Sequence, residues 1–344
     1  ALPSWFEVRS TGTLGDPPQE LETQQWEVLE RAAPLFERAQ VIEHVRASLS
    51  PRSDLPWREA TLVLMRWHAR GSELKLLTQV CGGDEALLEP FEDAVREALR
   101  RDAGAFEALH SVGILPEPTA LALIRAVGTA GEPDGLPWLA GQLDEPGRTD
   151  VALLEIVRLS RGRPCAEADE AAARVRPFLR SDSVGRRRQA MQALAALDDE
   201  SCAPLLLEAL EAPDAGERKA AFAALRRLSG RDLPDRLDLW RAWFLGELEW
   251  WRHESEPTLA ALASEHDAEV VAAARRLGER SLRRDELSLH LAPLLRTHAS
   301  PTVRLEVVRA LARLADPAAL GALALALDDP DPAVRRQAHA ALCG

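Results

Sequence analysis

One turn-and-helix pattern recurs through the second half of the chain and limits what it can fold into. The final residues read DPDPAVRRQAHAALCG, and similar stretches are SPTVRLEVVRALARLAD, DAGERKAAFAALRRLSG, SVGRRRQAMQALAALDD and, more faintly, HDAEVVAAARRLGE. Aligned at positions 186, 217, 269, 303 and 334, the copies are separated by 31, 52, 34 and 31 residues. A period of this length is typical of stacked supersecondary units.

Each copy has the apolar spacing of an amphipathic helix, as Val334, Ala338 and Leu342 illustrate. A second apolar helix is expected between copies, in SCAPLLLEALEAPD, TLAALASEHD, ELSLHLAPLLRTHAS and PAALGALALALDDPD. Such a helix pair can bury its apolar stripes only against its own partner and the next pair. The sequence therefore predicts an all-α fold, an α-solenoid (superhelix) of antiparallel helix pairs.

The repeat pattern weakens toward the N-terminus. It is recognisable over residues 118–344, where TALALIRAVGTAGEPDG begins the first clear unit. Residues 56–117 are expected to form degenerate helical repeats, and residues 1–55 an irregular N-terminal arm and cap. Only WFEVR, at residues 5–9, has the alternation of a short strand.

The stretch DPDPAVRRQAHAAL, with Asp331, Pro332, Val334 and Arg335, resembles the HEAT-type repeat, in particular the short bacterial form that also occurs in phycobilisome-lyase-like proteins. The resemblance covers residues 118–344 and implies a solenoid scaffold, a fold that serves many functions. It also implies that the second helix of each pair lines the concave face. The basic residues that would begin these concave helices are Arg187, Arg188, Arg218, Lys219, Arg304, Arg335 and Arg336.

These basic residues allow two interpretations. Asp214 and Arg218 are four residues apart, as are Asp331 and Arg335, and each aspartate stands at a plausible N-cap. A ladder of such pairs would join one repeat to its neighbour. The basic residues that directly follow Arg187, Arg218 and Arg335 lie about 100° further round each helix and are freer to contact a partner. These residues are Arg188, Lys219 and Arg336.

The 52-residue step contains a tryptophan-rich insert at residues 230–256. Helical spacing in LDLWRAWFLGELEWW predicts one apolar stripe, made of Leu237, Trp240, Trp243, Phe244, Leu248 and Trp251. Bacterial repeat proteins that resemble this one often carry a similar segment, here Gly230, Asp232, Trp240 and Trp243, which implies a structural insert. We expect an extra helix with its indoles packed inward. The alternative is a partner anchor of partly exposed side chains, for which Trp250 and Arg252 are the candidates because they lie off the stripe.

Charge and composition narrow the possible partners. Lysine and arginine total 42 against 55 acidic residues, a formal net charge of -13, which disfavours unselective binding to nucleic acid or anionic lipid. No stretch approaches the roughly 18 apolar residues of a membrane-spanning helix. A protein partner with an acidic or polar surface is expected. The localisation stays open: the cytoplasm is favoured, and the periplasm or the exterior applies if Ala1 is a mature N-terminus.

No recognised catalytic motif occurs in the sequence, whether GxGxxG, GxxxxGK[ST], GxSxG or HExxH. Helical-repeat hydroxylases that bind two irons use several His-Glu pairs, whereas His253 and Glu254 form a single one. Glu286, His290 and His298 share a helix face but would need further ligands to hold a metal. We therefore expect no catalytic residue, no metal and no cofactor.

The four cysteines show no CxxC pair and no metal-ligand spacing. Cys165 and Cys202 lie near the starts of successive units, so a disulfide is conceivable in an oxidising compartment. Buried free thiols are the favoured state.

The function that the sequence favours is a non-catalytic scaffold or adaptor, which binds a protein partner through the concave and terminal surfaces of a solenoid. Solenoids usually end in a polar-faced unit. Residues 318–344 end in an apolar helix, so we expect an intermolecular contact there. The alternative function is a helical-repeat DNA-binding enzyme of the DNA glycosylase type, which would use tryptophans and arginines around an aspartate. A lyase related to the phycobilisome lyases is a weaker alternative. The identity of the partner, the biological process and the oligomeric state are not encoded in these patterns.

Overall fold

The structure of the chain, a computed structural model, describes residues 23–50, 53–102, 104–161, 167–316 and 319–343. Regular structure within these ranges is helical throughout, and they contain no strand. None of their helices is both long enough and apolar enough to span a bilayer. The segment WFEVR lies outside the described residues, as do residues 1–22 and 51–52 of the expected N-terminal arm and cap.

The chain divides into two compact units, residues 1–177 (unit 1) and 178–344 (unit 2). This boundary falls within the segment 118–344 that carries the recognisable repeats. The three-part division expected from the sequence remains a prediction.

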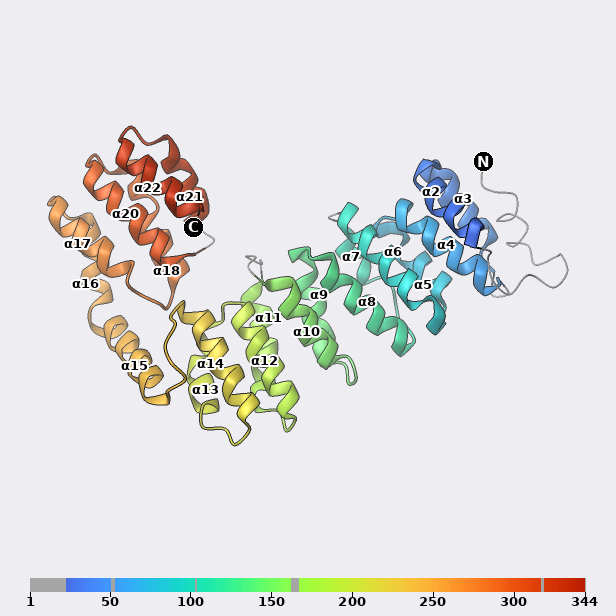
Figure 1. The fold of residues 1–344 in the computed structure, drawn as a ribbon, viewed down its shortest axis with the longest axis horizontal. Coiled ribbons are helices and arrows are strands. Elements are labelled where there is room, and N and C mark those ends of the chain that lie inside the picture. The colour runs from blue at the N-terminus through green and yellow to red at the C-terminus, as the bar shows by residue number, and fades with distance from the viewer. Residues whose placement is uncertain (1–22, 51–52, 103, 162–166, 317–318, 344) are drawn as a thin grey trace. The chain divides into compact units, whose positions relative to one another are not determined.

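Unit 1 contains two rows of helices (Figure 1). In one row α4, α6, α8 and α10 pack side by side in chain order, and α5, α7, α9 and α11 form the second row against them. Helices α2 and α3 pack against α4. The bounds are α2 Thr23–Ala32, α3 Arg38–Ser48, α4 Leu55–His68, α5 Leu74–Cys81, α6 Leu88–Arg101, α7 Ala105–Leu109, α8 Glu117–Ala130, α9 Leu136–Gly141, α10 Thr149–Ser160 and α11 Ala168–Val175.

Helix α8 shows why these pairs stack. Its sequence EPTALALIRAVGTA is apolar on nearly every side. After the first two residues, only the stripe of Leu121, Arg125 and Thr129 is partly accessible. The neighbours α6 and α10 cover its flanks. At Gly128 a Cβ atom would lie 2.5 Å from the Cβ of Glu155 on α10, so glycine is needed for this close approach.

Unit 2 continues the same architecture with more regular repeats (Figure 1). Helices α12 and α14 pack side by side, as do α17, α20 and α22, and the shorter helices pack against them. The bounds are α12 Val184–Ala196, α13 Ala203–Ala209, α14 Ala215–Ser229, α15 Leu237–His253, α16 Ser255–Ala260, α17 Asp267–Leu277, α18 Arg284–Leu291, α19 Leu294–Thr297, α20 Pro301–Leu314, α21 Leu320–Leu325 and α22 Pro332–Cys343. The predicted all-α solenoid of antiparallel helix pairs is confirmed.

The extra helix expected in the insert is α15, which follows α14 after Gly230 in the left-handed conformation. Trp240 is fully buried, and its indole N–H donates a hydrogen bond to the carbonyl of Pro234 at 3.0 Å. Its ring meets that of Trp243 edge to face, with centroids 5.6 Å apart. These two tryptophans hold the start of α15 in place.

The predicted stripe is wrong toward the end of α15. Leu248, expected to face inward, is 39% exposed, whereas Trp250, expected to lie off the stripe, is only 7% exposed and belongs to the apolar core that continues through α17, α20 and α22. A glutamate takes the inward position one turn earlier. Glu247 is buried because it accepts a hydrogen bond from the Ser281 amide at 3.3 Å and lies 3.8 Å from Arg280. The spacing of apolar residues does not predict where a charged residue is buried together with its polar partners.

Candidate functional site

In four repeats, an arginine near the start of the second helix forms hydrogen bonds that close the turn before that helix. The Nη1 group of Arg218 donates to the carbonyls of Ala212 and Pro213 at 2.7 and 2.8 Å. Arg335 does the same to Asp329 and Pro330 at 2.6 and 2.9 Å. The other two arginines that bond to carbonyls five and six residues earlier are Arg187 and Arg304. These arginines stabilise turns.

The ladder expected from Asp214, Arg218, Asp331 and Arg335 takes a different form. Asp214 accepts the amide of Glu217 at 2.7 Å, and Asp331 accepts the amide of Ala333 at 2.7 Å, so both aspartates cap their helices. The arginines four residues later, Arg218 and Arg335, bond instead to backbone carbonyls of the preceding turn.

Contacts between repeats come from other acidic residues. Arg187 on α12 forms two hydrogen bonds of 2.7 Å with Glu217 on α14. Arg304 on α20 binds Asp329 through two hydrogen bonds of 2.7 and 2.9 Å, and both of these residues are buried. A bidentate geometry of this kind fixes both side chains.

The predicted partner-binding residues do not form one site. Arg188 on α12 and Lys219 on α14 are exposed on adjacent helices, and the Arg188 guanidinium lies against Gly216. Arg336 is exposed on α22 and Arg252 at the end of α15. The sequence predicts Trp250 as a candidate anchor on the condition that it is partly exposed, but its side chain is buried. The role of these residues in binding remains a prediction.

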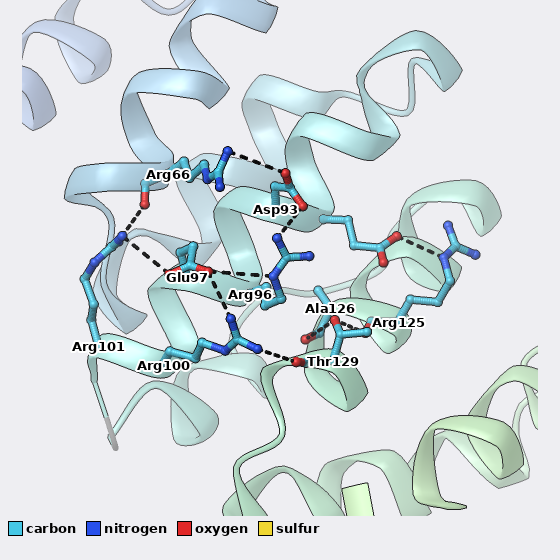
Figure 2. A network of polar contacts seen from close by, with 10 residues as sticks. Arg66, Asp93, Arg96, Glu97, Arg100, Arg101, Arg125, Ala126 and Thr129 are labelled. Carbon is cyan, nitrogen blue, oxygen red and sulfur yellow. Dashed lines mark hydrogen bonds and ion pairs between the residues drawn. The ribbon is translucent and has the colours of Figure 1, made fainter. Parts of the chain in front are cut away.

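The row of α4, α6, α8 and α10 in unit 1 exposes a face that the sequence patterns did not single out, here called the α4–α10 face. Figure 2 shows its polar network, in which the labelled residues are Arg66, Asp93, Arg96, Glu97, Arg100, Arg101, Arg125, Ala126 and Thr129. Asp93 pairs with Arg96 at 2.6 Å and with Arg66 at 3.8 Å, and so links α4 to α6. Arg125 on α8 pairs with Glu92 on α6 at 2.9 Å.

Several arginines of this face also bind the carboxyl ends of neighbouring helices. Arg100 donates to the carbonyls of Thr129 and Ala130 at 2.9 and 3.2 Å, and Arg101 donates to the carbonyl of Arg66 at 2.5 Å. A cation at the end of a helix is favourable because carbonyl dipoles converge there. The guanidinium groups are therefore held in place by backbone as well as by carboxylates.

Trp67 lies at the edge of this network. Its side chain is 44% exposed, and the Arg66 guanidinium carbon is 6.0 Å from the centre of its ring. Positive and negative side chains thus alternate over α4, α6 and α8 beside one exposed indole. Tryptophan and arginine are the residue types that most often dominate the energetics of protein interfaces.

Glu155 on α10 is buried against Gly128 and pairs with Arg158 at 3.0 Å. Burial raises the pKa of its carboxyl from 4.5 to about 7, although Arg158 acts in the opposite direction. The folded chain therefore holds this proton more tightly than the unfolded chain does. The stability that such a carboxyl contributes is fully present below its unfolded pKa and is lost as the pH rises through its folded pKa.

We expect the free energy of unfolding of unit 1 to fall as the pH rises from about 5 to 8, by about 1–3 kcal/mol from this group. Glu155→Gln removes the titrating proton and should remove this part of the pH dependence. Thermal unfolding of both proteins across this range measures the difference. Identical pH profiles for the two proteins would show that Glu155 ionises as an ordinary surface carboxyl does.

A second cluster of charges lies on α17 and α20 of unit 2. Three arginines converge on the buried carboxylate of Glu306: Arg275 at 3.4 Å, Arg309 at 3.5 Å and Arg313 at 3.3 Å. Two of these arginines could have been identified from their position within the repeats. Arg275 and Arg309 each lie nine residues after the N-cap residue of their helix, His266 and Ser300.

The histidines considered as metal ligands have other surroundings. The Nδ1 atom of His298 accepts the amide of Ser300 at 3.2 Å, and His253 and His290 are exposed. Within the described ranges no group of three or more His, Cys, Asp or Glu side chains has the arrangement of a metal site. Cys165 lies outside the described residues, so the disulfide with Cys202 stays an open question. Cys202 is buried, and its thiol donates to the carbonyl of Asp199 at 3.0 Å.

The last helix pair, α21 and α22, has exposed leucines. Leu320 and Leu325 on α21 are accessible, and Ala338 on α22 is buried against the core. An intermolecular contact through residues 318–344 remains a prediction.

Comparisons with known proteins find a match to HEAT repeats in one part of the chain. No curated protein matches the chain. An engineered protein of known structure is 17% identical, with 98% of this chain and 97% of that protein covered and a TM-score of 0.35. The CpcE and CpcF complex of phycocyanin lyase from a Nostoc species is 17% identical, with 70% and 94% covered and a TM-score of 0.35.

Human deoxyhypusine hydroxylase in complex with glycerol is 20% identical, with 94% of this chain and 98% of that protein covered and a TM-score of 0.29. The family model for HEAT repeats matches residues 288–343, which run from within α18 to the end of α22. This match agrees with the helix pairs and capped turns described above. Residues 288–343 are therefore HEAT repeats.

Proposed function

We propose that the chain is a non-catalytic scaffold or adaptor that binds a partner protein through the open faces of its helix rows. HEAT repeats generally mediate protein interactions. A stack of helix pairs presents a long surface on which many side chains can contact one partner. The single observation that carries the proposal is the α4–α10 face, where arginines are held by carboxylates and helix ends and the exposed Trp67 lies at the edge of the network beside Arg66.

The charges of this face favour a protein over a nucleic acid. The arginines on α4, α6 and α8 alternate with Glu92, Asp93 and Glu97, so the face is not uniformly positive. A nucleic acid binds through many phosphate contacts, each of which needs an unneutralised cation. A protein surface with mixed charges can instead match both signs, which gives orientation and specificity.

The proposal is tested by capture of partner proteins from the native source with the full chain as bait. Trp67→Ala combined with Arg125→Gln is expected to weaken capture of a specific partner by about 10- to 100-fold, because each change removes an anchor of the hot-spot type. Ile114→Ala is the matched control, since Ile114 is fully exposed in unit 1 on the loop between α7 and α8.

Quantitative mass spectrometry compares the three baits, and thermal unfolding confirms that all are folded. Partners retained equally by the wild type and the double variant would contradict a role for this face. Tight, salt-dependent binding of the chain to DNA would favour the alternative of a DNA-binding enzyme.

A further inference from the structure

The arginine cluster on α17 and α20 has more positive charge than its own contacts neutralise. Three guanidinium groups, of Arg275, Arg309 and Arg313, share the single carboxylate of Glu306. The side chain of Glu306 is 4% exposed, whereas those of the arginines are 57%, 45% and 42% exposed. The cluster therefore presents a surplus of two positive charges at the surface of a chain whose formal net charge is -13.

The donors of this cluster are largely unused. Arg275 contacts Glu306 through Nε, and Arg309 through one Nη1 group. Arg313 directs both of its Nη groups to the same carboxylate oxygen. Within the described part of the chain these guanidinium groups form no other hydrogen bond or ion pair. Because each guanidinium has five N–H donors, most remain available to a ligand.

The arginine cluster lies on two helices, α17 and α20, which belong to successive repeats. Arg275 and Arg309 occupy the same position of two successive repeats, and α17 and α20 pack side by side. Arg313 lies one turn beyond Arg309 on α20 and extends the cluster along that helix. At the corresponding position α12 and α14 carry no charge, since the residues there are Gln192 and Ala223. The equivalent positions of α6 and α8 in unit 1 hold Arg96 and Arg125, and each of these pairs with its own carboxylate, Asp93 or Glu92.

We propose that Arg275, Arg309 and Arg313 bind two neighbouring carboxylates on an acidic segment of the partner protein. This inference rests on the proposed adaptor function and names the chemistry of its partner. Guanidinium groups bind carboxylates through paired, charge-assisted hydrogen bonds. Packed helices lie about 8–10 Å apart, and alternate residues of an extended peptide are about 7 Å apart. Two acidic side chains can therefore reach both helices.

Glu306 has the role of a positioning residue. Its buried carboxylate holds the three arginine side chains together before any ligand binds. Less side-chain entropy is therefore lost when the ligand binds. The surplus of two charges favours a ligand with two negative groups over one with a single carboxylate. It is too small for a long polyanion, whose affinity depends on many contacts.

The test measures binding of a fluorescein-labelled oligoglutamate peptide to the full chain by fluorescence anisotropy at low ionic strength. Arg275→Gln and Arg309→Gln are each expected to weaken binding about tenfold, the scale of one charge-assisted hydrogen-bonded contact. Arg296→Gln is the matched control because it removes the same charge from an exposed arginine on α19. The control should change the affinity by less than about twofold.

Each outcome decides the inference. Loss of binding in the two variants but not in the control supports it. Equal binding by all four proteins, or no binding by the wild type, overturns it. A single-stranded oligonucleotide that binds more tightly than the peptide through the same arginines would also overturn it, because the ligand would then be a nucleic acid.

The same variants separate this inference from the proposed function. If Arg275→Gln with Arg309→Gln leaves partner capture unchanged while the α4–α10 face variant abolishes it, the acidic-segment site is wrong and the adaptor function stands. If neither face affects capture, the adaptor function itself fails.

Discussion

Trp250→Ala is expected to lower the free energy of unfolding of unit 2 by about 3–5 kcal/mol, the range for removal of a large aromatic side chain from a core. Trp250 belongs to the same buried apolar cluster as Val270, Leu277 and Leu291, which joins α15 to the later repeats. The Arg280 guanidinium carbon lies 4.9 Å from its ring centre, so the substitution also removes a cation–π contact. The change leaves a cavity that a rigid stack of helices fills only in part.

Leu245→Ala is the control for this prediction, because Leu245 lies on the same helix and is 63% exposed. Its effect should stay within about 0.5 kcal/mol, as for other surface substitutions. Chemical denaturation monitored by circular dichroism measures both. Similar small losses for the two variants would mean that α15 does not pack through Trp250.

Asp329→Ala is expected to cost about 3–5 kcal/mol, because it leaves the buried Arg304 guanidinium without its carboxylate. The pair is bidentate and buried on both sides, and Asp329 also accepts the amide of Asp331 at 2.8 Å. Asp331→Ala is the comparison two residues away. It removes a helix cap and should cost only about 1 kcal/mol.

The pH dependence of the Asp329 effect follows from its pKa. The hydrogen bonds from Arg304 lower the pKa of the Asp329 carboxyl below its ordinary value of 3.8, and burial opposes this only in part. A carboxyl whose pKa is lower in the folded chain stabilises the fold above its unfolded pKa, and this contribution is lost as the pH falls through the folded pKa. The stability difference between the wild type and Asp329→Ala should therefore be constant near neutral pH and shrink in strong acid. A difference that grows on acidification would contradict this ion pair.

The repeat architecture could be predicted because its determinants are local. Prolines and capping residues mark the helix starts, and the apolar spacing of each helix is regular from Val303 to Leu314 and again in α22. The phase of α15 could not be predicted toward its end. Glu247 is buried there through partners more than thirty residues away, and no local pattern contains that information.

The candidate binding surfaces were harder to predict from the sequence than the repeat architecture. Arginines such as Arg218 and Arg335 stand out in the repeats, yet they close turns, and the α4–α10 face lies where the repeats are least regular. Whether an arginine is neutralised depends on which carboxylate the neighbouring helix brings to it. Arg309 and Arg313 lie on the same helix as Glu306, and the full cluster forms only when α17 brings Arg275 beside α20.

The arginines that close four of the turns have a consequence for how such a chain changes in evolution. Arg218 and Arg335 bond to backbone carbonyls of their own repeats, and every sequence supplies those acceptors. A duplicated helix pair therefore brings the acceptors for its own turn-closing arginine, whereas a contact such as Arg187 with Glu217 also needs a matching residue in the next copy. Array length can grow or shrink by whole pairs, while the side chains that meet a partner diverge independently.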